Sequence, residues 1–498
     1  MSFKKTLDIC LLNLGVSRES GIVQLGFDRG MEKNRLLRVS AALSGSGFNA
    51  DVVDVRSGDH LKISGLGPKL IVASPTVSDI GAHLSLMEKI RSRLPGATIV
   101  ITGELASFSG EEIIWKNPGL IDHFISGDPD ENVLALARAL SLPRRRNIAR
   151  KSPNGGGRIV ISSAGCGGAC SFCAEKRFHD IGGEKGWRGI PPSKVADEIE
   201  EMLAGEDSIF GRFVTFADPN FPGQGRTGGM RALAMAREIS GRNLNICFEI
   251  RARVDSFLLM PDDALDSLRE AGLVSVFLGI ESFNPRVLKL YNKNISPADS
   301  IRVLKRLSAR GISVSSSTFI PINPWSDPSS LDKDYSSMKR LGLLTIWNMG
   351  RKLMALPGSR IERTLRKEGL LLSSYRYDRP FDYRFINPAV ERFSSRLDLV
   401  APVTVDEDVL VRKYDLIDAI LANRAPDLLR APGVQSERRK IESIRTGMAE
   451  LTYRYYKRAI SSRFPSSAPG EYIENMNLKI KSLDAGIVKY LAEAGRAI

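Results

Sequence analysis

Three cysteines of this chain, Cys166, Cys170 and Cys173, fall within eight residues. Three thiolates at this spacing can bind three irons of a cubane cluster and leave the fourth iron open to a substrate or a cofactor. Gly165 precedes the first cysteine and Gly167 follows it, so the backbone there can approach a bulky inorganic group closely. The segment therefore predicts a 4Fe–4S cluster with one open coordination site.

A structural zinc site is the alternative, with His179 as the fourth ligand. Closed zinc sites usually combine two pairs of closely spaced ligands, and no second cysteine pair is present here. The other two cysteines, Cys10 and Cys247, lie in apolar stretches and are expected to be small core residues. Five cysteines in 498 residues do not form a disulfide framework, so the cluster is the favoured interpretation.

Length and composition indicate a multidomain globular protein. A chain of 498 residues predicts two or three domains, and 43% hydrophobic with 26% charged residues is ordinary for such proteins. No apolar run reaches the roughly 18–20 residues that span a bilayer, and the first residues lack the apolar core of a signal peptide. We expect a cytoplasmic protein with no membrane partner.

The net charge of +14 is spread along the chain and is densest at residues 144–151. A basic stretch can attract RNA. Proteins that bind single-stranded nucleic acid also need aromatic side chains on which bases stack, and none interleaves with these charges. A solvated linker is therefore the favoured interpretation, and nucleic acid is not the expected partner.

The elements before the cysteines alternate between strands and helices. Apolar runs predict strands at 7–14, 50–55, 70–73, 98–102 and 121–125, and helical patterns include 35–43, 83–94 and 132–140. This alternation over residues 1–142 indicates an α/β, doubly wound, flavodoxin-like domain with a parallel sheet. Because ligands of such sheets bind at the carboxyl ends of the strands, the loops from Gly15, Ser74, Gly103 and Gly127 are candidate binding loops.

Residues 143–157 are rich in arginine, glycine and proline and predict a linker. The alternation restarts over 158–372, with strands predicted at 158–162, 213–217, 245–250, 275–280, 313–320 and 344–349. Long helical patterns such as 193–203 and 298–310 lie between them, and six β/α units predict a partial (β/α)6 TIM-like barrel. The cysteine loop follows the first strand, at the end where such barrels carry chemistry. Residues 373–498 predict a mainly helical region without a recognisable motif.

With these elements in place, residues 158–372 resemble the radical S-adenosylmethionine superfamily. The resemblance includes the cysteine spacing with an aromatic residue before the third cysteine, and four later segments in the expected order: 213–221, 253–255, 279–282 and 355–359. It implies that S-adenosylmethionine binds the open iron and is cleaved to a 5′-deoxyadenosyl radical after one electron arrives. A flavodoxin or ferredoxin-type electron donor is then required.

The same resemblance assigns candidate residues for S-adenosylmethionine. Phe172 would place backbone against the adenine, and Asp218 and Asn220 would bind the methionine amino group. Arg253 and Glu281 would hold the ribose or the carboxylate. Two alternatives stay open, because Asp218 to Asn220 can form a structural turn and Arg253 and Glu281 can form an ion pair with each other.

The first domain resembles the cobalamin-binding class of this superfamily. The candidate cobalamin-binding residues at its predicted strand ends are Ser74, Pro75, Thr76, Gly103, Glu104 and Gly127. Relatives usually have a second glycine where this chain has Glu104, whose side chain could crowd the nucleotide tail of the cofactor. The alternative is a flavodoxin-like domain that packs against the barrel or binds substrate.

Cobalamin would imply a methyltransferase that adds a methyl group to an unactivated carbon, or to phosphorus, of a small-molecule substrate such as a specialised metabolite. An oxidation, cyclisation or ring rearrangement is the alternative reaction. Two further alternatives are a methylthiotransferase, whose first domain would carry three cluster cysteines, and an adaptor without activity. The aromatic and basic residues that could line the substrate pocket are Trp325, Trp347, Tyr375, Tyr377 and Arg384.

Overall fold

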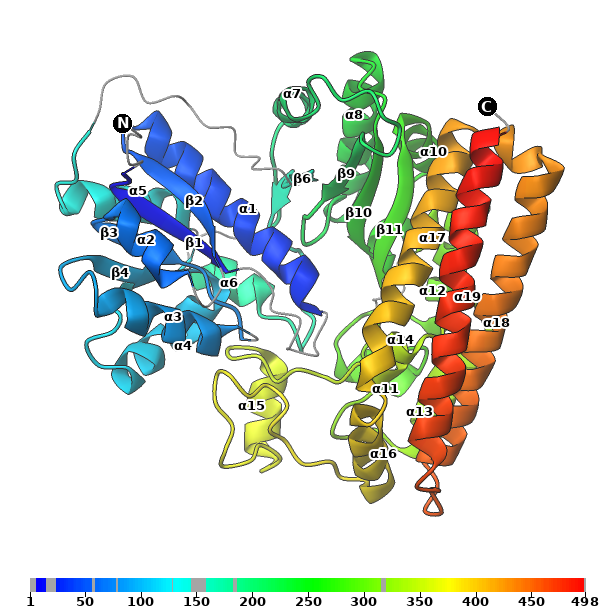
Figure 1. Cartoon of the computed structure of the whole chain (residues 1–498). Helices are drawn as coiled ribbons and strands as arrows, with labels where there is room; N and C mark the ends of the chain where they lie inside the picture. Colours follow the sequence, from blue (N-terminus) through cyan, green and yellow to red (C-terminus); the bar gives the residue numbers. More distant parts are fainter. Residues whose placement is uncertain are drawn as a thin grey trace.

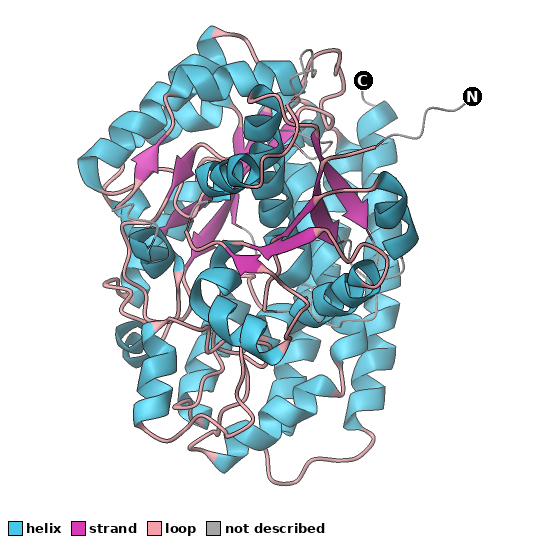
Figure 2. Cartoon of the chain, turned by 90° about the vertical axis from the view of Figure 1, so that its left-hand side faces the viewer, coloured by secondary structure: helices cyan, strands magenta, loops and turns pink. Residues whose placement is uncertain are grey.

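The computed structural model describes residues 6–14, 24–55, 59–77, 79–127, 129–144, 158–181, 186–314 and 319–496. Its elements fall into three groups along the chain: an α/β unit, a second α/β unit, and a set of long helices at the carboxyl end (Figure 1). Figure 2 shows that helices surround the strands, which lie in the interior. Most of the predicted linker, residues 145–157, and Gly15 lie outside the described residues.

The first unit contains a parallel five-stranded sheet. Its strands are β1 (Ile9–Leu14), β2 (Ala50–Val55), β3 (Leu70–Ala73), β4 (Thr98–Ile101) and β5 (His123–Phe124), in the spatial order β2-β1-β3-β4-β5. All four neighbouring pairs are parallel. The order reverses next to β1, as expected for a doubly wound sheet, whose ligands bind at the carboxyl ends of the strands.

Helices cover both faces of this sheet. They are α1 (Gln24–Gly45), α2 (His60–Leu66), α3 (Ile80–Arg91), α4 (Gly103–Lys116) and α5 (Pro129–Ala139). One core joins the sheet to α1 and α5, through residues such as Leu36 and Val133, while the other joins it to α2, α3 and α4, through residues such as Ile63 and Ile113. Apolar side chains that alternate along β1 enter the two cores in turn, with Ile9 in one and Cys10 in the other. The predicted doubly wound fold is confirmed.

The second unit contains another parallel sheet, in the order β12-β11-β10-β9-β6. Its strands are β6 (Ile159–Val160), β9 (Phe213–Phe216), β10 (Cys247–Arg253), β11 (Leu273–Gly279) and β12 (Ser313–Val314). A short antiparallel pair, β7 (Ser163–Ala164) and β8 (Arg188–Gly189), flanks it. The helices of this unit are α6 (Glu175–Ile181), α7 (Pro192–Met202), α8 (Gly225–Gly241), α9 (Val254–Leu258), α10 (Asp262–Ala271), α11 (Pro285–Leu290), α12 (Pro297–Ser308), α13 (Pro328–Arg340), α14 (Ile346–Gly350) and α15 (Arg360–Lys367).

The sixth predicted strand, at 344–349, is wrong: most of this segment is helix α14. The Thr345 hydroxyl accepts a hydrogen bond from the Asn348 backbone N–H over 3.1 Å, which is a typical helix N-cap. Parallel pairing instead resumes just after the helix, between Ile322 and Lys352, where the Leu353 N–H donates to the Ile322 carbonyl over 2.7 Å. The sixth position of the barrel is thus taken by residues a few places later in the chain. The Thr345 cap, together with the Glu407 carboxylate that accepts from the Ile346 N–H over 2.7 Å, overrides the β-propensity of the segment.

The carboxyl-terminal region is helical, as predicted. It contains α16 (Pro388–Asp398), α17 (Thr404–Arg424), α18 (Pro432–Ala459) and α19 (Ala468–Arg496), with two short 3₁₀ turns, η1 (Ala401–Val403) and η2 (Leu428–Arg430). Helices α17, α18 and α19 lie side by side along the second unit (Figure 1). Their apolar faces join the core of that unit through residues such as Val411, Ile441 and Leu483. No helix among the described residues is long and apolar enough to cross a membrane.

Candidate active site

The cysteine loop leaves β6 and β7 at the carboxyl end of the second sheet and is tied to two distant segments. The Ser171 N–H donates to the Tyr291 carbonyl over 3.0 Å, and Asn292 Nδ2 donates to the Ala169 carbonyl over 2.7 Å. The Ile361 N–H, at the start of α15, donates to the Ser171 carbonyl over 2.8 Å. These contacts fix the loop against the barrel. No local sequence pattern indicates them, because they join residues more than a hundred positions apart.

The three cysteines line one cavity of about 360 Å³. The Gly168 N–H donates to Cys166 Sγ over 3.4 Å, and Arg253 Nη1 donates to Cys170 Sγ over 3.1 Å. Donors aimed at sulfur suit thiolates that carry cluster charge. Within the described residues, no three ligand side chains converge on a position for a single metal ion, and the side chain of His179 lies outside those residues.

Arg253 and Glu281 both line this cavity, but they do not form the predicted alternative ion pair with each other. Arg253 is 7% exposed and binds Asp255 through two hydrogen bonds of 2.9 Å. Glu281 pairs with Lys293 over 3.3 Å and has a φ of 69°, a strained value for a residue with a side chain. Phe172 also lines the cavity, and its ring meets Tyr291 edge-on at 5.2 Å.

Asp218 and Asn220 do not line the cavity, because intramolecular hydrogen bonds hold both side chains. The Asp218 carboxylate is fully buried and accepts from the N–H groups of Ser162 and Ser163 and from the Ser162 hydroxyl, each over 2.6 Å. Asn220 Oδ1 accepts from the Arg253 N–H over 3.1 Å. The geometry therefore favours the structural alternative, in which Asp218 fixes the strand before the cysteines and Asn220 fixes the backbone of Arg253.

Burial raises the pKa of Asp218 to about 6, although its hydrogen bonds and the nearby Arg231 act in the opposite direction. Three hydrogen-bond donors nevertheless surround this carboxylate. A buried carboxylate needs such donors because no water is there to solvate it. The sequence could place Asp218 at the end of a strand but could not show which way its side chain points.

Of the residues predicted to line a substrate pocket, Trp347 does so. The other four have different places: Trp325 Nε1 donates to Glu368 over 2.7 Å, and the Tyr375 hydroxyl donates to the Ala355 carbonyl over 2.6 Å. Tyr377 is buried against the core of the first unit, and Arg384 donates to the Gly369 carbonyl.

The cavity also has polar lining residues that the sequence did not predict: Arg251, Lys293, Arg351, Lys352, Asp408 and Arg412.

With this geometry established, comparison with known proteins identifies the second unit. Residues 160–332 match the model of the radical SAM superfamily. This segment is a radical SAM domain. The cofactors of the superfamily are a 4Fe–4S cluster and S-adenosylmethionine, so the predicted resemblance is confirmed for the part of the chain that carries the cysteines.

Two curated relatives match parts of the chain. An uncharacterised methyltransferase of Pyrococcus horikoshii is 29% identical over 154 residues, which are 31% of this chain and 30% of the relative. The anaerobic magnesium-protoporphyrin IX monomethyl ester cyclase of Rubrivivax gelatinosus is 29% identical over 184 residues, which are 37% of this chain and 29% of the relative. The alignments thus span under a third of either relative.

One solved structure resembles almost the whole chain. It is the cobalamin-dependent S-adenosylmethionine radical enzyme OxsB with aqua-cobalamin and S-adenosylmethionine bound, at a TM-score of 0.68 and 15% identity. The match covers 99% of this chain and 81% of that structure. At this identity the likeness establishes the fold, including the order of the doubly wound unit, the radical SAM domain and the helical region.

The strand ends of the first unit form a connected edge. The Gly127 N–H, after β5, donates to the Ser107 hydroxyl over 2.9 Å, and that hydroxyl donates to the Gly103 carbonyl, after β4, over 2.8 Å. Gly103 and Gly127 have φ values of 90° and 77°, which favour glycine. After β3, Ser74 and Pro75 are buried, and the buried Thr76 hydroxyl has no hydrogen-bond partner among the described residues.

This edge lies next to the cysteine loop of the radical SAM domain. Cys173 lines the cavity and is exposed, while desolvation by the nearby protein raises the pKa of its thiol. The charges of Glu175 and Glu104 raise that pKa further. Four residues after Cys173, the Arg177 guanidinium lies 5.6 Å from the ring centre of Phe108 in α4. The two units also touch where Phe108 of α4 packs against Gly358. The strand ends of the doubly wound unit therefore meet the barrel at the cysteine loop.

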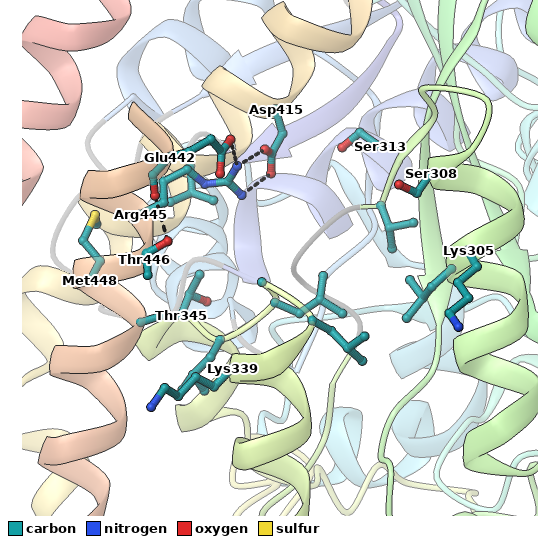
Figure 3. Close-up of a pocket in the computed structure, with 18 of the residues that line it drawn as sticks. Lys305, Ser308, Ser313, Lys339, Thr345, Asp415, Glu442, Arg445, Thr446 and Met448 are labelled. Atoms are coloured by element: carbon teal, nitrogen blue, oxygen red, sulfur yellow. Dashed lines mark hydrogen bonds and ion pairs between the residues drawn. The ribbon is translucent and has the colours of Figure 1, made fainter. Parts of the chain in front are cut away.

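A second cavity, of about 760 Å³, lies between α12, β12, α17 and α18 and contains none of the predicted site residues (Figure 3). Arg445 points between Asp415 and Glu442 and contacts them over 2.9 and 3.0 Å. Glu407 lines this second cavity and its neighbour Asp408 lines the first, so the first turn of α17 separates the two.

Proposed function

We propose that this protein is a cobalamin-dependent radical S-adenosylmethionine methyltransferase that acts on a small molecule. One observation carries the proposal: a doubly wound unit meets a radical SAM domain next to its three-cysteine loop, where Arg177, four residues after Cys173, stacks on Phe108 of α4. The methyltransferase name of the Pyrococcus relative supports the reaction class. The aqua-cobalamin and S-adenosylmethionine bound in the OxsB structure support the cofactors.

The donor set fits an iron–sulfur cluster. Three thiols of one loop share a cavity, and N–H donors from Gly168 and Arg253 reach two of the sulfurs. A bound cluster and S-adenosylmethionine would together supply the chemistry that removes hydrogen from an unactivated position of a substrate. The cavity residues Phe172, Arg253 and Glu281 would orient S-adenosylmethionine, and the apolar walls would exclude water.

The first unit fits cobalamin at its strand ends. A buried hydroxyl without a partner among the described residues, that of Thr76, offers a hydrogen bond to a ligand. Gly103 and Gly127 lie at the neighbouring strand ends, and because they have no side chain a ligand can approach their backbone closely. Ser74, Pro75 and Glu104 lie at the same edge of the sheet. Bound cobalamin would supply the methyl group, and the protein would hold it between this edge and the barrel.

In this proposal, residues 1–142 bind cobalamin and residues 143–157 are a linker. Residues 158–372 carry the cluster, and residues 373–498 cover the barrel. A flavodoxin or ferredoxin-type protein would deliver the electrons, because amino-acid side chains do not supply them. Cys10 does not suit a cluster in the first unit, since it is fully buried in β1 and burial raises its pKa to about 12.

The test is product analysis under anaerobic conditions. Protein with a rebuilt cluster is given hydroxocobalamin, a strong reductant and S-adenosylmethionine, and 5′-deoxyadenosine and S-adenosylhomocysteine are quantified by chromatography with mass detection. We expect both products from the natural chain and no 5′-deoxyadenosine after Cys166, Cys170 and Cys173 are changed to alanine. Cys247→Ala is the matched control, because this cysteine is buried in a separate apolar cluster. Absence of both products from protein with an intact cluster would refute the proposal.

A cobalamin-type enzyme that oxidises, cyclises or rearranges its substrate without methylation is the second candidate. The observation that favours it is the cyclase name of the Rubrivivax relative. Formation of 5′-deoxyadenosine without S-adenosylhomocysteine would select this candidate over the methyltransferase.

A further inference from the structure

The active-site cavity has a basic wall made by Trp347, Arg351, Lys352 and Arg412. The first three belong to α14 and the two residues after it, while Arg412 comes from α17 in the helical region. None of them belongs to the cysteine loop or to the strand ends that hold Arg253 and Glu281. The wall therefore adds a separate set of groups to the site, brought there by the late part of the chain.

The cations of this wall are held in place by neighbouring groups. The Arg351 guanidinium lies 5.3 Å from the centre of the Trp347 ring, and its Nε donates to the Phe319 carbonyl over 3.3 Å. Lys352 contacts Asp398 over 3.2 Å, but that carboxylate is 71% exposed and the contact is correspondingly weak. Arg412 lies 4.0 Å from Asp408, at the outer limit of an ion pair. Because a guanidinium carries several N–H donors, it can keep such contacts and still bind a ligand.

Trp347 supplies a neutral donor in the same wall. The residue is 9% exposed, and its buried Nε1–H has no acceptor among the described residues. A buried donor without a partner carries an unfavourable desolvation cost, which calls for an explanation such as a bound ligand or water. An acceptor atom from a bound molecule would remove this cost.

Positive charge also exceeds negative charge over the whole cavity. Among its described lining residues, six are cationic and three are carboxylates: Arg251, Arg253, Lys293, Arg351, Lys352 and Arg412 against Glu175, Glu281 and Asp408. Arg253 is committed to Asp255 and Cys170, and Lys293 to Glu281. Besides these groups, the lining holds Arg251, which stacks on Phe277, and the three cations of the basic wall. Low-dielectric walls focus the field of such cations on a ligand of opposite charge.

We propose that the basic wall binds an anionic group of the substrate, a phosphate or a carboxylate. A guanidinium can donate two parallel N–H···O hydrogen bonds to two oxygens of a phosphate or a carboxylate. The indole N–H of Trp347 is a further donor. Apolar residues of the same cavity, Phe277, Met354 and Leu356, suit the carbon part of the molecule. Assigning this anion to the substrate rests on the proposed function, whereas the anion site itself does not.

The test measures anion binding directly. Full-length protein with a rebuilt cluster and saturating S-adenosylmethionine is titrated with inorganic phosphate, acetate or neutral acetamide, and binding is followed by ligand-observed NMR. We expect phosphate or acetate to bind, acetamide not to bind, and the double variant R351Q/K352Q to weaken anion binding at least tenfold. The tighter of the two anions identifies the group. Arg392→Gln, an exposed arginine of α16, is the matched control and should not change the affinity.

Two milder variants keep the test decisive if the double variant does not fold. Arg351→Lys keeps the charge and should weaken binding only a fewfold, whereas Arg412→Gln should weaken it about tenfold. Equal anion binding by the natural chain and by the folded wall variants would overturn the proposal. Loss of anion binding when S-adenosylmethionine is added would also overturn it, because the wall would then bind the cofactor's own carboxylate.

The same samples separate this inference from the proposed function. If 5′-deoxyadenosine does not form but the wall variants selectively lose anion binding, the proposed function fails and the anion site stands. If 5′-deoxyadenosine forms and the wall variants bind anions normally, the radical SAM activity stands and the anion site fails.

Discussion

Arg253 donates a hydrogen bond to Cys170 Sγ over 3.1 Å while Asp255 binds the other edge of its guanidinium. A residue at the end of β10 is thereby joined to a cysteine 83 positions earlier in the chain. The same guanidinium lies where a side chain on Gly168 would be. The cluster loop is thus shaped around one arginine.

Changing Arg253 to glutamine should impair the cluster without unfolding the protein. Hydrogen bonds to cluster sulfurs raise the reduction potential, and a hydrogen bond to a charged group contributes about 1.5–3 kcal/mol. We expect a more negative potential, measured by redox titration with EPR detection, and S-adenosylmethionine cleavage about ten- to a hundredfold slower. Arg242→Gln is the control, since this arginine binds surface carboxylates of α7 and α8. An unchanged potential would argue against the assigned contact.

Gly168→Ala should reduce the iron content of the rebuilt protein. The new methyl group would overlap the Arg253 guanidinium, which Asp255 holds and which therefore cannot move aside without losing its partners. Iron and sulfide analysis, together with the visible absorbance of the cluster, measures the effect. Gly241→Ala, at the end of α8, meets no atom within 4 Å and should bind iron normally. Normal iron content in both variants would contradict the prediction.

Thr76→Val should weaken cobalamin binding by about three- to tenfold, the effect of one lost hydrogen bond of about 0.5–1.5 kcal/mol. The two side chains have nearly the same shape, so only the buried hydroxyl is removed. Spectroscopic titration with hydroxocobalamin measures the affinity. Thr98→Val lies at the opposite end of the same sheet, at the start of β4, and should bind cobalamin as the natural chain does. If the natural chain and both variants bind cobalamin with equal affinity, Thr76 does not contact the cofactor.

Glu407→Gln should change how stability depends on pH. Burial raises the pKa of Glu407 to about 8 from an ordinary 4.5, so the folded protein favours the protonated acid. The associated stabilisation is complete below about pH 4.5 and is lost as the pH rises through about 8, because the carboxylate must then ionise inside the protein.

The glutamine variant has no such proton to lose. Its thermal unfolding should therefore depend less on pH between 5 and 9, and above pH 8 it should melt a few degrees higher than the natural chain. Glu391→Gln, at an exposed position of α16, serves as the control. Parallel melting profiles for all three proteins would show that Glu407 ionises normally.

Much of the first unit is predictable because its strands are short apolar runs between strong helical patterns. The strands predicted there differ from the observed ones by at most two residues at either end, and the doubly wound order follows from general connection rules. The prediction at 344–349 fails because the same residues suit a strand by propensity and a helix by capping. In the structure the Asn348 N–H bonds the Thr345 hydroxyl and the Ile346 N–H bonds Glu407 of α17, and both contacts favour the helix.

The sequence alone determined the cysteine loop, because its chemistry depends on residue types and on spacings within a few positions of one another. The tertiary structure alone decided which polar side chains face the cavity. Asp218 and Asn220 stand at a strand end, yet their side chains turn into the protein and bind backbone. Arg351 follows α14 and Arg412 lies within α17, and neither local sequence carries a motif, yet both line the cavity with Cys166. Such positions depend on packing between elements that are up to about 250 residues apart, and no local pattern records that packing.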